Sequence, residues 1–228
     1  MITSRQNDHF KTLKNLQKKR AREISRVSAS DLSRVYTCTD QSYPCETVRM
    51  SKGLIEEVTY RGGDAIAVVK KQKISLDGLE FFIVADGMEK PGNVGAILRT
   101  ADATGFQGIV SVGEGVDIYS PNVIRASLGA FFTQRVVTST KQEIIEYCKK
   151  EEIPIYSATP EAKTSLYHIQ FPTKMCIVVG SEAFGVSDIL KNASTCFSLP
   201  MYGEIDSLNA STAFGIIAYE IIRQRNFI

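Results

Sequence analysis

The chain has 228 residues, of which 43% are hydrophobic and 23% charged, a composition typical of a globular protein with room for one α/β domain and a small appendage. No apolar run reaches about 18 residues and the first residues lack a signal-peptide core, so we expect a cytoplasmic protein with no transmembrane helix. Five cysteines without a Cys-x-x-Cys pair, and two histidines far apart, argue against a disulfide framework or a metal site.

The net charge of +2 is unevenly distributed. Residues 1–26 carry eight basic and two acidic side chains, a net charge of +6, which leaves −4 for the remainder. Within this segment the apolar spacing predicts a helix over residues 7–22, capped by Asn7. A basic arm indicates a polyanionic partner, but it is also typical of a solvated helix face.

The next part of the chain is less regular. Short apolar runs predict strands at residues 35–38 and 65–69, with turns at Pro44, Gly53 and Gly62. A basic, polar break then precedes a domain boundary that we place near residue 76. Residues 1–75 are therefore expected to form a small N-terminal α/β part, and residues 76–228 the larger domain.

Beyond this boundary, buried strands alternate with helices. The predicted strands are 81–85, 108–112, a short one near Val136, 154–157, 175–179 and 195–199, and the predicted helices are 93–104, 123–128, 141–151, 186–190 and 207–225. This order predicts a mostly parallel sheet with helices on both faces. Ligands bind such sheets beyond the carboxyl ends of the strands, where three glycine-containing turns lie: 86–95, 180–185 and 200–209.

Two glycine patterns exclude common nucleotide sites. Gly180 and Gly185 have the spacing of a phosphate-binding loop, but Val186 stands where that loop needs a lysine. Gly113 and Gly115 are not followed by the third glycine of a dinucleotide fingerprint. Both patterns are therefore interpreted as turns.

The polar residues at the turns have structural as well as functional interpretations. Arg99, with Asp102 three residues on, is either an exposed ion pair or a guanidinium presented to RNA phosphate oxygens. Asp206 or Ser207 could simply cap the last helix. A cap needs only one such residue, however, whereas Ser207, Asn209 and Ser211 cluster at this junction.

Taken in order, the segments Asn93–Ala103, Gly180–Ser187 and Pro200–Ser211, with the link Tyr119–Ala130, resemble the SpoU (TrmH-like) branch of the SPOUT methyltransferases. The resemblance covers about residues 80 to 226. It implies a C-terminal trefoil knot and a bent S-adenosylmethionine (SAM) as co-substrate, with no metal. The implied cofactor contacts are Gly180, Leu199 and Leu208, with Met201 nearby.

The resemblance also implies the reaction. Arg99 falls on the position proposed in the family to activate an RNA ribose 2′-hydroxyl, and Asn93, Glu182, Ser207 and Asn209 fall on the other polar motif positions. Because a guanidinium is a poor base, we assign Arg99 to holding a phosphate and stabilising the developing alkoxide.

The family's homodimer is also implied. The apolar side chains of the final helix suit either an isologous dimer contact or the intramolecular core. They are Ala213, Phe214, Ile217, Ile221 and Ile222.

The chain departs from the family pattern at three places. Lys90 precedes Pro91 where aspartate is common, and Ala183 replaces a frequent glycine. The N-terminal start resembles the family's ribosomal-protein-like RNA-binding extension, but the stretch that normally follows is missing after Arg22. This indicates a shortened substrate-binding domain.

The sequence therefore predicts a SAM-dependent 2′-O-methyltransferase acting on structured RNA, with 23S-type ribosomal RNA as substrate and neither DNA nor a membrane as partner. A tRNA substrate is one alternative. A catalytically silent RNA-binding or ribosome-assembly factor on the same fold is another, against which the intact motif residues argue. A different α/β enzyme that binds a small nucleotide is disfavoured by the missing phosphate loop.

Overall fold

The computed structural model describes residues 32–59, 63–69 and 74–226. The helix predicted at residues 7–22 and its basic side chains lie outside the described residues. Over the ranges that are described, no helix is both long and apolar enough to cross a membrane.

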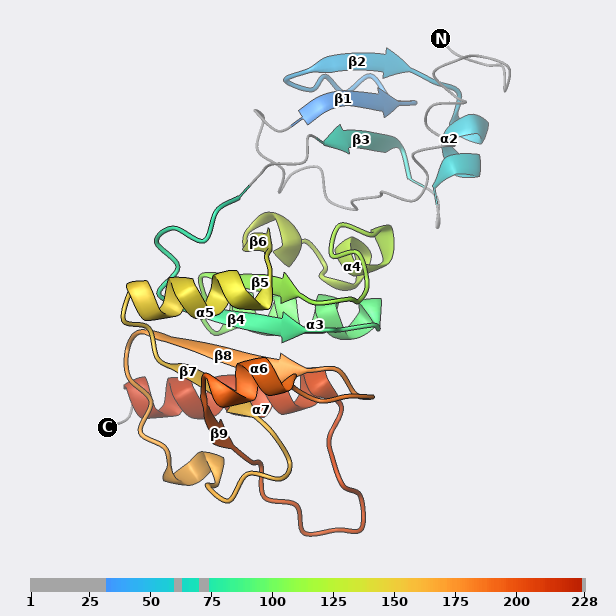
Figure 1. Cartoon of the computed structure of the whole chain (residues 1–228). Coiled ribbons are helices and arrows are strands. Elements are labelled where there is room, and N and C mark those ends of the chain that lie inside the picture. The colour runs from blue at the N-terminus through green and yellow to red at the C-terminus, as the bar shows by residue number, and fades with distance from the viewer. Residues whose placement is uncertain (1–31, 60–62, 70–73, 227–228) are drawn as a thin grey trace.

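A small three-stranded sheet comes first in the chain (Figure 1). Its strands are β1 (Leu32–Thr37), β2 (Glu46–Arg49) and β3 (Ala65–Val69), in the order β2-β1-β3, and helix α2 (Lys52–Val58) follows β2. Strand β1 pairs in parallel with β2 and antiparallel with β3. The sequence predicted β1 and β3 but missed β2, whose four residues are all partly or fully exposed, and α2, in which Gly53 suggested a turn.

The second sheet has six strands in the order β6-β5-β4-β8-β7-β9, and all neighbouring strands pair in parallel. The strands are β4 (Phe81–Asp86), β5 (Gly108–Val112), β6 (Arg135–Thr138), β7 (Ile155–Ala158), β8 (Met175–Gly180) and β9 (Thr195–Phe197). The α-helices are α3 (Pro91–Ala103), α4 (Pro121–Ala126), α5 (Lys141–Lys150), α6 (Asp188–Asn192) and α7 (Ala210–Asn226). Two short 3-10 helices are η2 (Ala130–Phe132) and η3 (Leu166–His168). The predicted parallel α/β fold is confirmed.

Both faces of this sheet are covered, as Figure 1 shows with α5 and α6 in front and α3 and α7 behind. Along β4, Phe81, Ile83 and Ala85 enter the core under α3 and α7, whereas Phe82 and Val84 enter the core under α5 and α6. Successive side chains of a strand point to opposite faces, so a strand buried on both sides must be apolar throughout. This explains the continuous apolar runs in the sequence.

Helix α7 begins three residues later than predicted, at Ala210, because Asn209 rather than Asp206 or Ser207 caps it. Its residues Phe214, Ile217 and Ile221 are completely buried against the sheet and α3. These three side chains therefore belong to the intramolecular core. A homodimer contact through α7 would have to use its other side chains.

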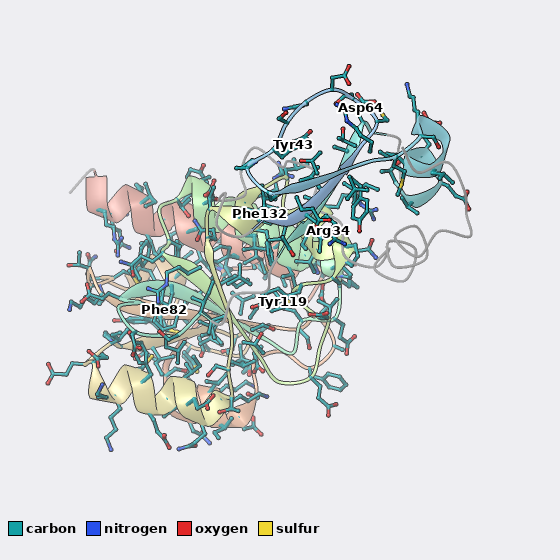
Figure 2. All side chains as sticks on the ribbon, turned by 90° about the horizontal axis from the view of Figure 1, so that it is seen from above. Arg34, Tyr43, Asp64, Phe82, Tyr119 and Phe132 are labelled. Atoms are coloured by element: carbon teal, nitrogen blue, oxygen red, sulfur yellow. The ribbon has the colours of Figure 1, made fainter. Side chains whose placement is uncertain are left out.

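Helix α3 is held closely against α4. A Cβ atom added to Gly95 would lie 2.3 Å from the Cβ of Ala126, so only glycine permits this approach. After α4, Phe132 of η2 packs against the small sheet through the cluster of Leu32, Val35 and Ala67. Figure 2 shows Phe132 at the junction of the two sheets. A continuous series of contacts thus joins the small sheet to α3.

The centre of the large sheet, where β4 lies between β5 and β8, is its topological switch point. There Asp86 pairs in register with Gly180. The buried carboxylate of Asp86 accepts the N–H of Ser187 at 2.8 Å and lies 3.0 Å from Lys141 Nζ. Asp86 therefore fixes the turn that follows β8.

We expect Asp86→Ala to lower the free energy of unfolding by about 2 to 3 kcal/mol, because it leaves a backbone N–H and an ammonium group without their partner. Urea unfolding measures the change. The control is Asp188→Ala, which removes a carboxylate that is 93% exposed and should change stability by less than about 0.5 kcal/mol. Equal losses in the two variants would contradict this role for Asp86.

Candidate active site

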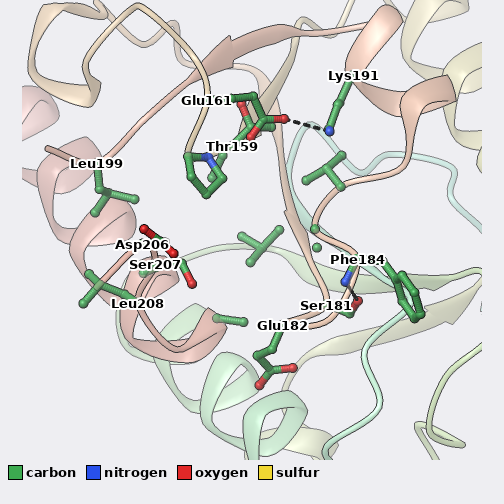
Figure 3. Close-up of a pocket in the computed structure, with 18 of the residues that line it drawn as sticks. Thr159, Glu161, Ser181, Glu182, Phe184, Lys191, Leu199, Asp206, Ser207 and Leu208 are labelled. Carbon is green, nitrogen blue, oxygen red and sulfur yellow. Dashed lines mark hydrogen bonds and ion pairs between the residues drawn. The ribbon is translucent and has the colours of Figure 1, made fainter. Parts of the chain in front are cut away.

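A pocket of about 290 Å³ opens beyond the carboxyl ends of β7, β8 and β9 (Figure 3). Five chain segments line it: the turns after β7 and β8, helix α6, the loop between β9 and α7, and the start of α7. The lining residues are Ala158–Glu161, Val179–Glu182, Phe184–Val186, Lys191, Leu199, Met201, Asp206–Leu208, Ala210 and Ala213. The sequence placed the ligand site at this end of the sheet, and the pocket lies there.

The turn after β8 is the tightest part of the wall. A Cβ atom on Gly180 would lie 2.0 Å from the carbonyl carbon of Gly185 and 2.3 Å from the nitrogen of Val186. The N–H of Gly185 donates to the carbonyl of Ser181 at 2.9 Å, and Gly185 itself has a left-handed φ of +65°. The two glycines therefore bring the backbone of the turn back onto its own start, where peptide groups border the pocket.

Three side chains from the three predicted turns form a hydrogen-bonded chain beside the pocket. Asn209 Oδ1 caps α7 by accepting the N–H groups of Ser211 at 3.0 Å and Thr212 at 3.4 Å. Its Nδ2 must then face the other way, and it donates to Asn93 Oδ1 at 3.1 Å. Asn93 Nδ2 in turn donates to Glu182 Oε1. The cap of α7 thus determines the donor-to-acceptor direction of both hydrogen bonds in this series of side chains.

Residues distant in sequence meet here. Asn93 is buried in the first turn of α3, whereas the Glu182 side chain is 24% exposed and also lies 3.6 Å from Lys90 Nζ. In this arrangement the Glu182 carboxylate accepts one hydrogen bond from an amide. Its remaining oxygen lone pairs are available to a ligand on the solvent side.

Arg99 lies on the exposed face of α3 and does not line the pocket. The ion pair with Asp102, one of its two interpretations, is not formed. Asp102 Oδ1 instead accepts from Thr133 Oγ1 at 2.6 Å and Gln134 Nε2 at 3.3 Å. Among the described residues, no carboxylate forms an ion pair with Arg99. Within that part of the chain, its side chain is exposed.

The structure brings together eight of the nine residues singled out in the sequence. Gly180, Glu182, Leu199, Met201, Ser207 and Leu208 line the pocket, and Asn93 and Asn209 join it through Glu182. Arg99 stands apart.

Three parts of the pocket wall were not predicted from the sequence: the segment Ala158–Glu161, Phe184 and Lys191. The segment Ala158–Glu161 lies at the carboxyl end of β7, where ligands of parallel sheets bind, so its position could have identified it. It contains no glycine, which was the signal used for the other turns.

One ion pair shapes the charge of the pocket. Lys191 Nζ lies 2.8 Å from Glu161 Oε1 (Figure 3), and this hydrogen bond holds the pKa of Glu161 below its usual range. The Glu161 carboxyl is therefore ionised at neutral pH. With Glu182 and Asp206 it gives the pocket three carboxylates against one ammonium, which favours a ligand that carries positive charge.

Fold and pocket together define an α/β protein with its ligand site beyond the strand ends of a parallel sheet. The model of the SpoU rRNA Methylase family matches residues 80–219. The chain thus belongs to this family of RNA methyltransferases.

Three individual proteins are also similar to this chain. A protein of Staphylococcus saprophyticus named for the TrmH family of tRNA/rRNA methyltransferases is 34% identical over 74% of this chain and 68% of its own. A solved structure called RNA 2′-O ribose methyltransferase is 30% identical, with a TM-score of 0.76 and 98% of each chain covered. The AdoMet-bound rRNA methyltransferase of Sinorhizobium meliloti has a TM-score of 0.88 at 22% identity, covering 100% of this chain and 98% of that one.

Proposed function

We propose that this protein transfers a methyl group from SAM to a ribose 2′-hydroxyl of ribosomal RNA. The observation that carries the proposal is the pocket itself, which is lined by the second and third motif segments. Asn93 of the first motif segment is joined to it by hydrogen bonds to Glu182 and Asn209. The name of the 30%-identical structure, which states 2′-O ribose methylation, supports the chemistry.

The pocket residues fit SAM. Apolar walls from Leu199, Met201 and Leu208 suit an adenine ring, and the backbone around Gly180 offers peptide groups to its polar edge. The carboxylates suit a cationic sulfonium. When bound, SAM supplies a methyl group that an oxygen nucleophile can attack. The trefoil knot stays a prediction.

The chain's own residues position and activate the hydroxyl in this proposal. The 2′-oxygen forms a bond to the methyl carbon as the carbon–sulfur bond breaks, and its proton leaves to a phosphate oxygen or to water. Arg99 holds the RNA phosphate and stabilises the developing alkoxide. Glu182, fixed by Asn93 and Asn209, and Ser207 orient the ribose by hydrogen bonds. Holding the oxygen in line with the methyl group supplies much of the acceleration.

Substrate choice rests on the N-terminal part. We propose that residues 1–75 form the RNA-binding domain and that the protein acts as a homodimer. Phe132 would then transmit the position of bound RNA through η2 and α4 to α3, which carries Asn93 and Arg99. A basic segment before such a sheet favours a large, structured RNA.

The test uses the full-length protein, methyl-labelled SAM and total RNA from a strain that lacks the gene, with the RNA then separated by size. We expect label in the large ribosomal RNA. Label confined to tRNA would retain the methyl transfer and refute the rRNA assignment. SAM binding without transfer to any fraction would establish the silent RNA-binding alternative in its place.

A further inference from the structure

Phe184 is an exposed aromatic side chain held by a rigid turn. It is 82% exposed, although a large apolar ring is usually buried. Its N–H donates to Ser181 Oγ at 3.2 Å, and the Ser181 side of the turn is locked by the bond from Gly185. Ser181 is itself buried. The backbone beneath the ring is thus fixed, and the exposure is a feature of the turn.

The ring stands at the rim of the pocket, two residues after Glu182. Within the described part of the chain it is the one aromatic side chain that lines this pocket. Figure 3 shows it beside Ser181 and turned away from Leu199, Asp206 and Ser207 on the opposite wall. The ring therefore faces solvent and not the interior of the pocket.

The surrounding charge limits what can contact the ring. Glu182 lies two residues before Phe184 and Asp206 lies on the opposite wall, and these two carboxylates disfavour the phosphate backbone of an RNA over the pocket. An uncharged nucleobase has no such conflict. A nucleotide whose ribose enters a pocket has to leave its helical stack, and unstacked RNA bases are commonly received on aromatic rings.

We propose that Phe184 is the stacking platform for an unpaired nucleobase of the substrate RNA, at or next to the nucleotide that is methylated. The proposal rests on the proposed function and extends it to the recognition of the base. Phenylalanine offers a π-face without hydrogen-bonding groups, so the platform recognises that a base is unpaired and not which base it is.

The chain contains no tryptophan, so Phe184→Trp places its single tryptophan fluorophore at the proposed contact. We expect single-stranded oligoadenylate and ribosomal RNA to quench its fluorescence, and a fully paired RNA duplex to leave it unchanged. The matched control is Tyr167→Trp on η3, which replaces a ring that is 56% exposed and should not respond. Phe184→Ala should raise the KM for RNA by about 5- to 150-fold, the loss expected for one base–aromatic stack, while Phe184→Tyr should restore it.

Several outcomes would overturn the proposal. One is quenching by SAM in the absence of RNA, which would place the ring against the cofactor. Another is an unchanged KM for RNA in Phe184→Ala. A third is conversion of a dimer to a monomer in that variant, which would show that a second copy of the chain covers the ring. Methyl transfer by the wild-type protein is measured alongside: its absence would refute the proposed function, while the fluorescence still decides whether Phe184 binds unpaired RNA.

Discussion

Replacing Arg99 by alanine should lower the rate of methyl transfer by about 10²- to 10³-fold, the loss typical of removing one preorganised donor to a developing oxyanion. SAM binding and thermal stability should stay at their wild-type values, because the side chain is exposed and does not line the pocket. The rate is measured in single turnover, and SAM affinity by calorimetry. A lower single-turnover rate without a change in SAM affinity identifies a role in the chemical step or in RNA placement.

Two controls sharpen this prediction. Arg99→Lys keeps the charge but loses the planar fork that binds a phosphate through two bonds, so its rate should fall between those of the wild type and the alanine variant. Lys149→Ala removes an exposed cation from α5, on the opposite face of the sheet, and should leave the rate unchanged. Transfer at the wild-type rate by Arg99→Ala would remove Arg99 from the mechanism.

Gly180→Ala should have the largest effect on the pocket. The new methyl group would overlap the carbonyl of Gly185 and the nitrogen of Val186, and these backbone atoms cannot move aside as a flexible side chain can. We expect a loss of about 3 kcal/mol in the free energy of unfolding, at the upper end for overpacking. This corresponds to a fall of roughly 6 to 12 °C in the melting temperature.

The same variant should lose measurable SAM binding, because the turn that borders the pocket must open to admit the methyl group. Gly203→Ala is the matched control in the loop between β9 and α7. A Cβ atom there would meet nothing within 4 Å, so stability and binding should be preserved. Normal SAM affinity in Gly180→Ala would show that the close approach of Gly180 to Gly185 is not required for the cofactor site.

Local sequence signals predicted most of the large sheet. Apolar runs such as residues 81–85 and 175–179 are long enough to be recognised alone, and their alternation with helices determines a parallel sheet. The small sheet was harder, since β2 has only four residues and buries none of them completely. Its pairing with β1 depends on contacts that a local pattern does not contain.

The candidate site was predictable to the extent that it depends on turns at strand ends. Glycine spacing and clustered polar residues identified Gly180, Glu182 and Asn209. The sequence did not show that Asn93, 116 residues before Asn209, would join it to Glu182. Nor could it identify the Glu161–Lys191 ion pair, because neither residue stands next to a glycine motif.

We propose that the methyl group goes to a ribose 2′-oxygen. The most direct test is alkaline hydrolysis of RNA that the purified protein has labelled from methyl-labelled SAM. A methylated 2′-oxygen cannot attack the neighbouring phosphate, so we expect the label to be recovered in an alkali-resistant dinucleotide. Label recovered in mononucleotides, as base methylation would give, would contradict it.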